Sequence, residues 1–272
     1  TIQASGDSPD LIIWPETAYP YLITEKEESF GELKSISKKS NADLLVGTVL
    51  FENERYYNSA ILLSDEEDKS IYKKVHLVPF GEYIPFTEQL NFLRKYIDKP
   101  IGAYSRGEDF SLFKVRTTSS GIEDGSRTRM IRFYKYGVMI CFEDVFPYVA
   151  RKFVASGANF LVNITNDAWF GKTAAPLQHM QASVFRAVEN RCPVIRAANT
   201  GISCFISMNG EVSDIVKEED GNTFTEGYVT SKIEVGSRKS FYTVYGDVFV
   251  IFSLFMAIFI IGAQKFIKNT EK

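Results

Sequence analysis

The sequence predicts an α/β fold in which apolar strands alternate with helices, followed by one long apolar helix near the C-terminus. Three observations support this prediction. Short apolar runs of strand length recur up to residue 216, amphipathic segments separate several of them, and seventeen residues without a charge (VFVIFSLFMAIFIIGAQ) occupy 248–264. We therefore expect a sheet that is buried on at least one face, with helices packed against it.

Composition limits the classes of protein that this chain can belong to. It has 272 residues, of which 45% are hydrophobic and 24% charged, so it can bury a large core. The net charge of −3 argues against a nucleic-acid partner, because proteins bind nucleic acids largely by neutralising their phosphates. Three cysteines cannot all pair, and a chain of this length needs no disulfide framework. The mean hydropathy of −0.10 is that of a soluble protein, but it averages over the apolar C-terminal stretch.

The expected elements follow one another along the chain. The apolar run at 11–14 predicts a strand because Pro15 ends it, and Pro147 suits the first turn of a helix over 147–155. Asn209-Gly210 between two apolar runs predicts a tight hairpin. Strands are expected at 11–14, 43–50, 57–63, 71–74, 135–141, 160–164, 194–198, 202–208 and 212–216, and helices at 25–39, 147–155 and 175–189. The long segment 85–129 lacks a clear period and is expected to be a loop or a lid.

The apolar stretch predicts a transmembrane helix over 241–264, because about 20 apolar residues cross a bilayer. The alternative is a core helix. Lys265, Lys268 and Lys272 follow, which places a tail of 265–272 in the cytoplasm and a domain of 1–240 outside it. Such a domain needs an export signal, yet the chain begins at Thr1, so we expect it to be a fragment of a longer protein.

Three residue types that can act together in acyl transfer stand at the ends of predicted strands. Cys141 ends the strand GVMIC just before a helix start, where it can be presented as a nucleophile. Glu16 follows the strand at 11–14, Lys74 ends the strand at 71–74, and Glu82 lies in the turn after it. Each has an ordinary alternative: a buried structural cysteine, a surface carboxylate or a solvated lysine. Their combination supplies a base, a cation and a thiolate.

The chain has only two histidines, so a Cys-His protease would have to use His76 or His179. Neither lies in a motif that supports this interpretation. Cys192 and Cys204 have no turn setting like that of Cys141, and both are expected in the core.

Four segments together resemble one known family. They are WPETAYP, YKKVHLVPFGEYIP, GVMICFEDVFP and the stretch NITNDAWFG with the following PLQHMQASVFRAVENRCPVIRAANTGIS. This set resembles the apolipoprotein N-acyltransferases, the membrane-embedded branch of the carbon-nitrogen hydrolase (nitrilase) superfamily. The resemblance extends from about residue 10 to the C-terminal helix. It implies an αββα sandwich, and it implies N-terminal membrane helices that this chain lacks.

The resemblance also implies roles for individual residues. Glu16 in WPET matches the general base, Lys74 the residue that stabilises the transition state, and Cys141 the nucleophile. Glu82 at the end of HLVPFGE and Glu143 after the nucleophile match auxiliary active-site glutamates.

Two aromatic residues belong to the matching segments. The family often carries Tyr where this chain has Phe142, whose backbone N–H would still be available for an oxyanion hole. Trp169 in NDAWFG resembles the substrate-side loop, with a core aromatic as the alternative.

The implied reaction is transfer of an acyl chain from a membrane phospholipid, through a thioester, to the α-amino group of the diacylglyceryl-modified cysteine of a lipoprotein. No cofactor or metal is expected. The resemblance implies a monomer in the bacterial cytoplasmic (inner) membrane, with its catalytic domain on the periplasmic side. Two alternatives stay open: a nitrilase-like hydrolase of small amides with the same triad, and a non-catalytic module that binds lipid or lipoprotein.

Overall fold

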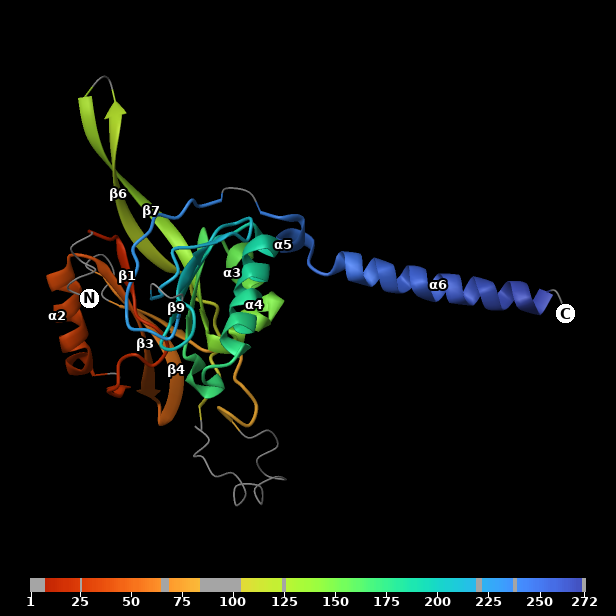
Figure 1. The fold of residues 1–272 in the computed structure, drawn as a ribbon, viewed down its shortest axis with the longest axis horizontal. Helices are drawn as coiled ribbons and strands as arrows, with labels where there is room; N and C mark the ends of the chain where they lie inside the picture. Colours follow the sequence, from red (N-terminus) through yellow and green to blue (C-terminus); the bar gives the residue numbers. More distant parts are fainter. Residues whose placement is uncertain are drawn as a thin grey trace, which may run out of the picture.

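The computed structural model describes residues 8–24, 26–64, 69–83, 104–123, 126–218, 222–236 and 239–270. Two β-sheets lie face to face between helices (Figure 1). The strands are β1 (Leu11–Ile13), β2 (Ile23–Thr24), β3 (Asp43–Glu52), β4 (Arg55–Leu63), β5 (Ser70–Lys73), β6 (Phe113–Glu123), β7 (Ser126–Ile140), β8 (Phe160–Thr165), β9 (Val194–Ala198), β10 (Cys204–Ile206) and β11 (Val212–Ser213). The helices are α2 (Gly31–Ser40), α3 (Pro147–Ala155), α4 (Ala175–Asn190), α5 (Phe241–Tyr245) and α6 (Val248–Thr270), with short 3-10 turns η1 (Glu27–Phe30), η3 (Cys141–Val145) and η4 (Asp167–Phe170).

Each sheet mixes parallel and antiparallel pairs. The first has the order β1-β3-β4-β5, with β2 also beside β3, and its β1 and β2 run parallel to β3. The second has the order β11-β10-β9-β8-β7-β6, and its central strands β7, β8 and β9 are parallel. The ends of these parallel strands therefore meet along one edge, where β7 leads into η3 and β8 into η4.

Alternation of side chains along the strands builds the layers. In β3, Leu44 and Val46 share a core with Leu33 of α2, whereas Leu45 shares a core with Val138 and Val162 of the second sheet. Residues at successive positions of a strand point to opposite faces, so one strand serves two cores. Helices α3 and α4 lie beyond the second sheet (Figure 1). The order helix, sheet, sheet, helix confirms the predicted αββα sandwich.

The predicted loop over 85–129 is partly wrong. Residues 84–103 lie outside the described part of the chain, but β6 pairs along its whole length with residues 126–136 of β7, in a hairpin whose end projects from the body (Figure 1). Phe113 and Val115 are buried in the main core, with exposed Lys114 and Arg116 between and beside them. This is a strand alternation, which the many Ser, Thr and Arg residues nearby concealed.

The apolar C-terminal stretch is divided. Gly246 has a φ of 65°, which separates α5 from α6, so the long helix begins at Val248 rather than near Phe241. The large apolar side chains of α6 from Val248 to Ile261 are exposed. Among the residues searched, which are the described ones, no helix meets the length and apolarity needed to cross a bilayer. The predicted transmembrane helix is therefore not confirmed.

Candidate active site

The structure brings together the residues that the sequence placed at three strand ends. Glu16 follows β1, Lys74 follows β5, and Cys141 follows β7. Glu16 and Lys74 are 7% and 1% exposed, so their charges act in a medium that screens them poorly. Strand pairing fixes the position of Lys74, because its backbone N–H donates to the carbonyl of Asn58 next to the paired residues of β4 and β5.

Glu16 is held by two donors that bind its two carboxylate oxygens. The Asn58 side-chain amide donates to Oε1 at 2.7 Å, and the backbone N–H of Asn166 donates to Oε2 at 2.8 Å. Gly47 of β3 makes room for this segment, since a Cβ there would stand 2.3 Å from the carbonyl oxygen of Pro15. Burial raises the pKa of Glu16, while the nearby Lys74 and Asn58 oppose that rise.

Lys74 is paired with two carboxylates. Its Nζ lies 2.9 Å from Oε1 of Glu82 and 3.9 Å from Oε1 of Glu16. Burial would favour the neutral amine, but the carboxylates of Glu16 and Glu82 oppose it, and the pKa of Lys74 is raised above its usual value. Lys74 is therefore a permanent cation at neutral pH, suited to stabilising an anion.

Cys141 occupies a strained turn between β7 and η3. Its φ of 54° lies in the left-handed region, which costs a residue other than glycine on the order of 1 kcal/mol. The side-chain amide of Asn163 donates to the Cys141 carbonyl at 3.0 Å and fixes this turn. Among the influences on Glu16, the Cys141 thiol is one that lowers its pKa, against the larger rise that burial causes. Burial, and next the charge of Glu16, raise the pKa of Cys141 to about 12, so the resting group is a thiol.

The two auxiliary glutamates have different surroundings. Glu82 joins the charged group directly, because its Oε1 accepts from Lys74 and from Asn58 at 3.0 Å. Glu143 is fully buried and accepts hydrogen bonds from the Ile140, Val75 and His76 backbone N–H groups and from the Tyr72 hydroxyl. Burial raises its pKa to about 7. It thus ties the loop after Lys74 to the turn that carries Cys141.

The two predicted aromatic residues lie at the surface. Phe142 is 36% exposed and Trp169 of η4 is 69% exposed. The alternative interpretation of Trp169 as a core aromatic is wrong. Phe170 and Leu177 nearby along the chain are also exposed, at 39% and 51%. The segments that follow β7 and β8 therefore carry large apolar side chains that are exposed at the surface.

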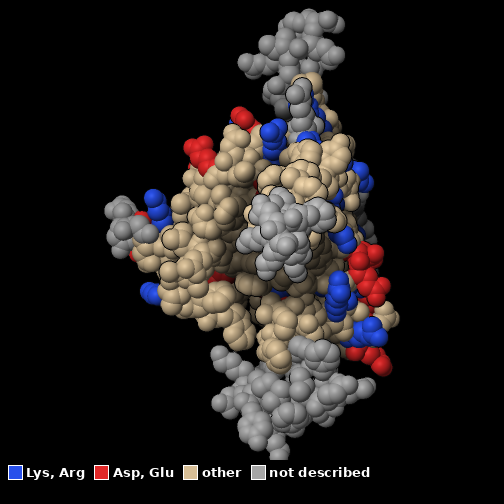
Figure 2. All heavy atoms as spheres, turned by 90° about the vertical axis from the view of Figure 1, so that its right-hand side faces the viewer, with Lys and Arg blue, Asp and Glu red and all other residues tan. Residues whose placement is uncertain are grey.

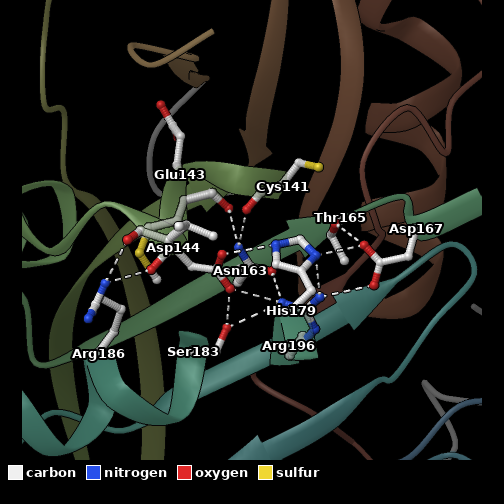
Figure 3. Close-up of polar contacts among 12 residues, drawn as sticks. Cys141, Glu143, Asp144, Asn163, Thr165, Asp167, His179, Ser183, Arg186 and Arg196 are labelled. Atoms are coloured by element: carbon white, nitrogen blue, oxygen red, sulfur yellow. Dashed lines mark hydrogen bonds and ion pairs between the residues drawn. The ribbon is translucent and has the colours of Figure 1, made fainter. Parts of the chain in front are cut away.

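Sequence reasoning missed a layer of buried polar side chains behind the parallel strands. Arg196 of β9 donates to Asp144 at 3.0 Å and to Asp167 at 3.1 Å (Figure 3). His179 of α4 places its Nε2 2.9 Å from Asp144 and its Nδ1 2.8 Å from Asp167. We call Asp144, Asp167, His179 and Arg196 the buried ion layer. Buried carboxylates need such partners, and the long separations in sequence gave no local pattern to detect.

The buried ion layer also decides the alternative of a Cys-His protease. Both ring nitrogens of His179 face carboxylates, so the imidazole is held as a double donor. Burial lowers the pKa of His179, but the hydrogen bonds to Asp144 and Asp167 outweigh it and raise the pKa to about 9. The Nδ1 of His76 contacts the Tyr148 hydroxyl at 2.8 Å. The structure gives no support to either histidine as the base for Cys141.

Cys192 and Cys204 are buried, 2% and 1% exposed, which confirms both as core residues. Neither carries a buried carboxylate or lysine beside it of the kind found at Cys141. Across the described residues, no three His, Cys, Asp or Glu side chains are grouped to hold a metal ion.

An αββα sandwich with a cysteine in a strained turn after a central strand defines a nitrilase-like protein. Comparison with protein families agrees: the carbon-nitrogen hydrolase model matches residues 3–241. The chain belongs to this family.

Two relatives extend the comparison to named proteins. An apolipoprotein N-acyltransferase of Geobacter metallireducens is 38% identical over 251 residues, which cover 90% of this chain and 44% of that protein. Another, of Allorhizobium ampelinum, is 39% identical over 218 residues, covering 77% and 38%. The chain therefore spans less than half the length of these relatives.

Two solved structures share the fold. An amidase of Nesterenkonia sp. AN1, with acrylamide added at its active-site cysteine, has a TM-score of 0.52 and 16% identity over 79% of this chain and 78% of its own. Nit3 of Saccharomyces cerevisiae, a nitrilase-superfamily member, has a TM-score of 0.54 and 18% identity over 79% and 75%. At this identity the likeness shows the fold alone.

Proposed function

We propose that the chain is the catalytic part of an apolipoprotein N-acyltransferase that works through a thioester on Cys141. The observation that carries the proposal is the grouping of a buried carboxylate, a buried ammonium and a thiol at three strand ends. Glu16 is the base, Lys74 the oxyanion-stabilising cation, and Cys141 the nucleophile. No cofactor or metal takes part in this scheme.

The first half-reaction loads the enzyme. Glu16 takes the thiol proton of Cys141, and the sulfur attacks an ester carbonyl of a phospholipid. Lys74 and backbone N–H groups near Phe142 stabilise the oxyanion. The C–O bond then breaks, and the lysophospholipid oxygen takes the proton from Glu16 as it leaves. An acyl thioester remains on Cys141.

The second half-reaction transfers the acyl chain. The free α-amino group of a diacylglyceryl-modified N-terminal cysteine attacks the thioester, and Glu16 accepts one of its protons. The C–S bond breaks, an amide forms, and the proton returns to the sulfur of Cys141. The raised pKa of Glu16 supports this role, because a weaker acid is a stronger base toward the thiol.

Three further residues are assigned by their surroundings. Glu82 shares Lys74 with Glu16 and holds the ammonium in place. Glu143 positions the two loops that carry Lys74 and Cys141. Trp169, which is exposed beside the other apolar side chains, contacts the acyl chain or the lipid acceptor.

The proposed substrates are lipids, so the proposal places the chain at the bacterial inner membrane, as a monomer with 1–240 on the periplasmic side. The segment 241–264 is the proposed membrane helix and 265–272 the cytoplasmic tail. Supporting this, α6 exposes large apolar side chains from Val248 to Ile261. Figure 2 views the molecule from the side on which α6 projects, and the charged atoms of the described residues lie mainly toward the edges of that view.

The test is detection of the thioester. The 272-residue chain is mixed with phospholipid vesicles, and mass spectrometry of the protein seeks an acyl adduct on Cys141 with release of lysophospholipid. Adding a diacylglyceryl-cysteine peptide with a free amine should discharge the adduct and yield the N-acylated peptide. Cys141→Ala should abolish the adduct, whereas Cys192→Ala, a matched change at a core cysteine, should leave it.

The outcomes separate the alternatives. Release of ammonia from small amides without any lipid-derived adduct would replace the proposal with a nitrilase-like hydrolase. Lipid binding without any adduct would indicate a non-catalytic module. An adduct that persists in Cys141→Ala would end the proposed mechanism.

A further inference from the structure

Thr165 is a buried residue that no step above uses. It is the last residue of β8, and the pairing of Ile140 with Ile164 between β7 and β8 places Thr165 beside Cys141. Its hydroxyl donates to Oδ1 of Asp167 at 3.1 Å (Figure 3). Burial raises the pKa of Cys141, and a side-chain hydrogen bond with Thr165 opposes that rise. Thr165 therefore stands between the proposed nucleophile and the buried ion layer.

A threonine hydroxyl has one proton and two possible acceptors in this position. While Cys141 is a thiol, the carboxylate of Asp167 is the better acceptor, which agrees with the hydrogen bond present. Once Cys141 has lost its proton, its sulfur is an anion in a partly buried site. A single rotation about the Thr165 Cβ–Oγ1 bond would then redirect the hydroxyl proton to the sulfur.

Asp167 is equipped to lose that hydrogen bond. Its Oδ1 also accepts from Nδ1 of His179 at 2.8 Å, and its Oδ2 accepts from Arg196 at 3.1 Å. Two charged partners therefore remain when the hydroxyl turns away. A buried carboxylate without them would hold the Thr165 proton and oppose the rotation.

We propose that Thr165 is a further catalytic residue, whose hydroxyl turns from Asp167 to the Cys141 sulfur and stabilises the thiolate. The proton of Cys141 goes to Glu16, while the Thr165 proton stays on its own oxygen and only its hydrogen bond changes partner. The inference rests on Cys141 being the nucleophile of the proposed function. In this scheme the Thr165 hydroxyl, at the end of β8, donates a hydrogen bond to the thiolate sulfur of Cys141.

The experiment measures how fast iodoacetamide alkylates Cys141 from about pH 7 to about pH 10, with the site identified by peptide mass mapping. Thr165→Val keeps the shape of the side chain and removes the hydroxyl. We expect the alkylation rate of Cys141 to fall about tenfold at each pH of this range, the effect of one hydrogen bond to a charged group.

Two further variants separate direct contact from loosened packing. Thr165→Ser restores the hydroxyl, and its profile should lie within about twofold of the wild type. Ser183→Ala removes another buried hydroxyl, which donates to Asp144 of the same layer at 2.5 Å, and should leave the profile unchanged. Thermal melting of each variant shows whether it is folded.

The proposal is overturned if Thr165→Val alkylates like the wild type, or if Ser183→Ala changes the profile as much. Alkylation needs no lipid, so its result is independent of acyl transfer. A normal Thr165→Val profile together with a Cys141 thioester would leave the proposed function intact and remove only this residue from it.

Discussion

The structure holds two buried groups of charged side chains, which differ in their ratio of carboxylates to cations. The candidate active site has two carboxylates, Glu16 and Glu82, around the single cation of Lys74. The buried ion layer has two carboxylates and two cations, Arg196 and the protonated His179. The layer is balanced and suits a structural role.

The candidate active site has one more carboxylate than it has cations, and this excess of negative charge allows it to accept a proton. A carboxylate that shares its cation with another carboxylate is more basic than one with a cation of its own. Glu16 can therefore take a proton from a neighbour, whereas Asp167, whose pKa is lowered by His179 and Arg196 despite its burial, cannot readily do so. The contrast predicts that changes in the first group affect catalysis and changes in the second affect stability.

The largest expected effect is on catalysis. Glu16→Gln keeps the size of the side chain but removes the base, so the rate of acyl transfer should fall about 10²–10⁴-fold. The free energy of unfolding should fall by only about 1–3 kcal/mol, because the single carbonyl oxygen of Gln can accept from Asn58 or from Asn166 but not from both. Single-turnover acylation and urea denaturation measure the two quantities. A large loss of stability would contradict the assigned contrast.

The next effect is on stability. Arg196→Met leaves Asp144 and Asp167 with only His179 as a charged partner in a site of 0–1% exposure. We expect the free energy of unfolding to fall by about 3–5 kcal/mol, the cost of breaking a buried ion pair. Urea denaturation followed by circular dichroism measures it. Exposed Arg132→Met serves as the control and should lie within about 0.5 kcal/mol of the wild type.

A smaller effect is expected from pH alone. The pKa of His179 rises from 6.5 to about 9 on folding, so the folded state binds its proton more tightly than the unfolded state. This contribution, roughly 3 kcal/mol, is complete below about pH 6.5 and is lost as pH rises through about 9. Thermal melting across this range should show a fall in the wild type and a flatter line in His179→Gln. Equal slopes would mean that His179 is not protonated.

The smallest of these effects concerns Asn58, whose amide nitrogen joins the two carboxylates of the active site. Asn58→Ala removes donors to Glu16 and Glu82, at 2.7 and 3.0 Å, and should slow acylation about tenfold. Ser59→Ala, at the next position of β4, is the control, because within the described residues its hydroxyl donates to the carbonyl of Tyr57 and not to a charged group. Acylation rates of the two variants compare them. Equal rates would show that Asn58 serves packing alone.

Much of the fold could be predicted from local pattern. The helix at 147–155 and the strand at 194–198 were placed with the bounds that the structure gives them, because Pro147 and the apolar runs mark their ends. The strand β6 was missed, since its alternation is hidden among polar residues. Trp169 could be placed in a motif, but its exposure depends on how η4 meets the rest of the fold.

The residues of the candidate site also fall into those that the sequence could indicate and those that it could not. Glu16, Lys74 and Cys141 could be singled out because each has its own local setting, a strand end beside Pro, Gly or an apolar run. Asn58 and Thr165 could not be singled out, since Asn58 lies inside an ordinary strand and Thr165 at the end of one. Asn58 matters because it contacts Glu16, 42 positions away in the sequence. Thr165 matters because of its neighbour across a strand pair. A polar residue within an otherwise apolar strand was the available signal for each.

The sequence by itself determined the order of elements, the family resemblance and the three residues proposed for catalysis, because periodicity, turn residues and motifs are written in neighbouring positions. The tertiary structure alone decided that Glu16 and Glu82 share one cation, whereas the two carboxylates of the buried ion layer have two cations. That outcome depends on contacts between β4 and the segment after β1, or between β9, α4 and η4. The free energy of a buried charge is set by the groups that the fold places beside it.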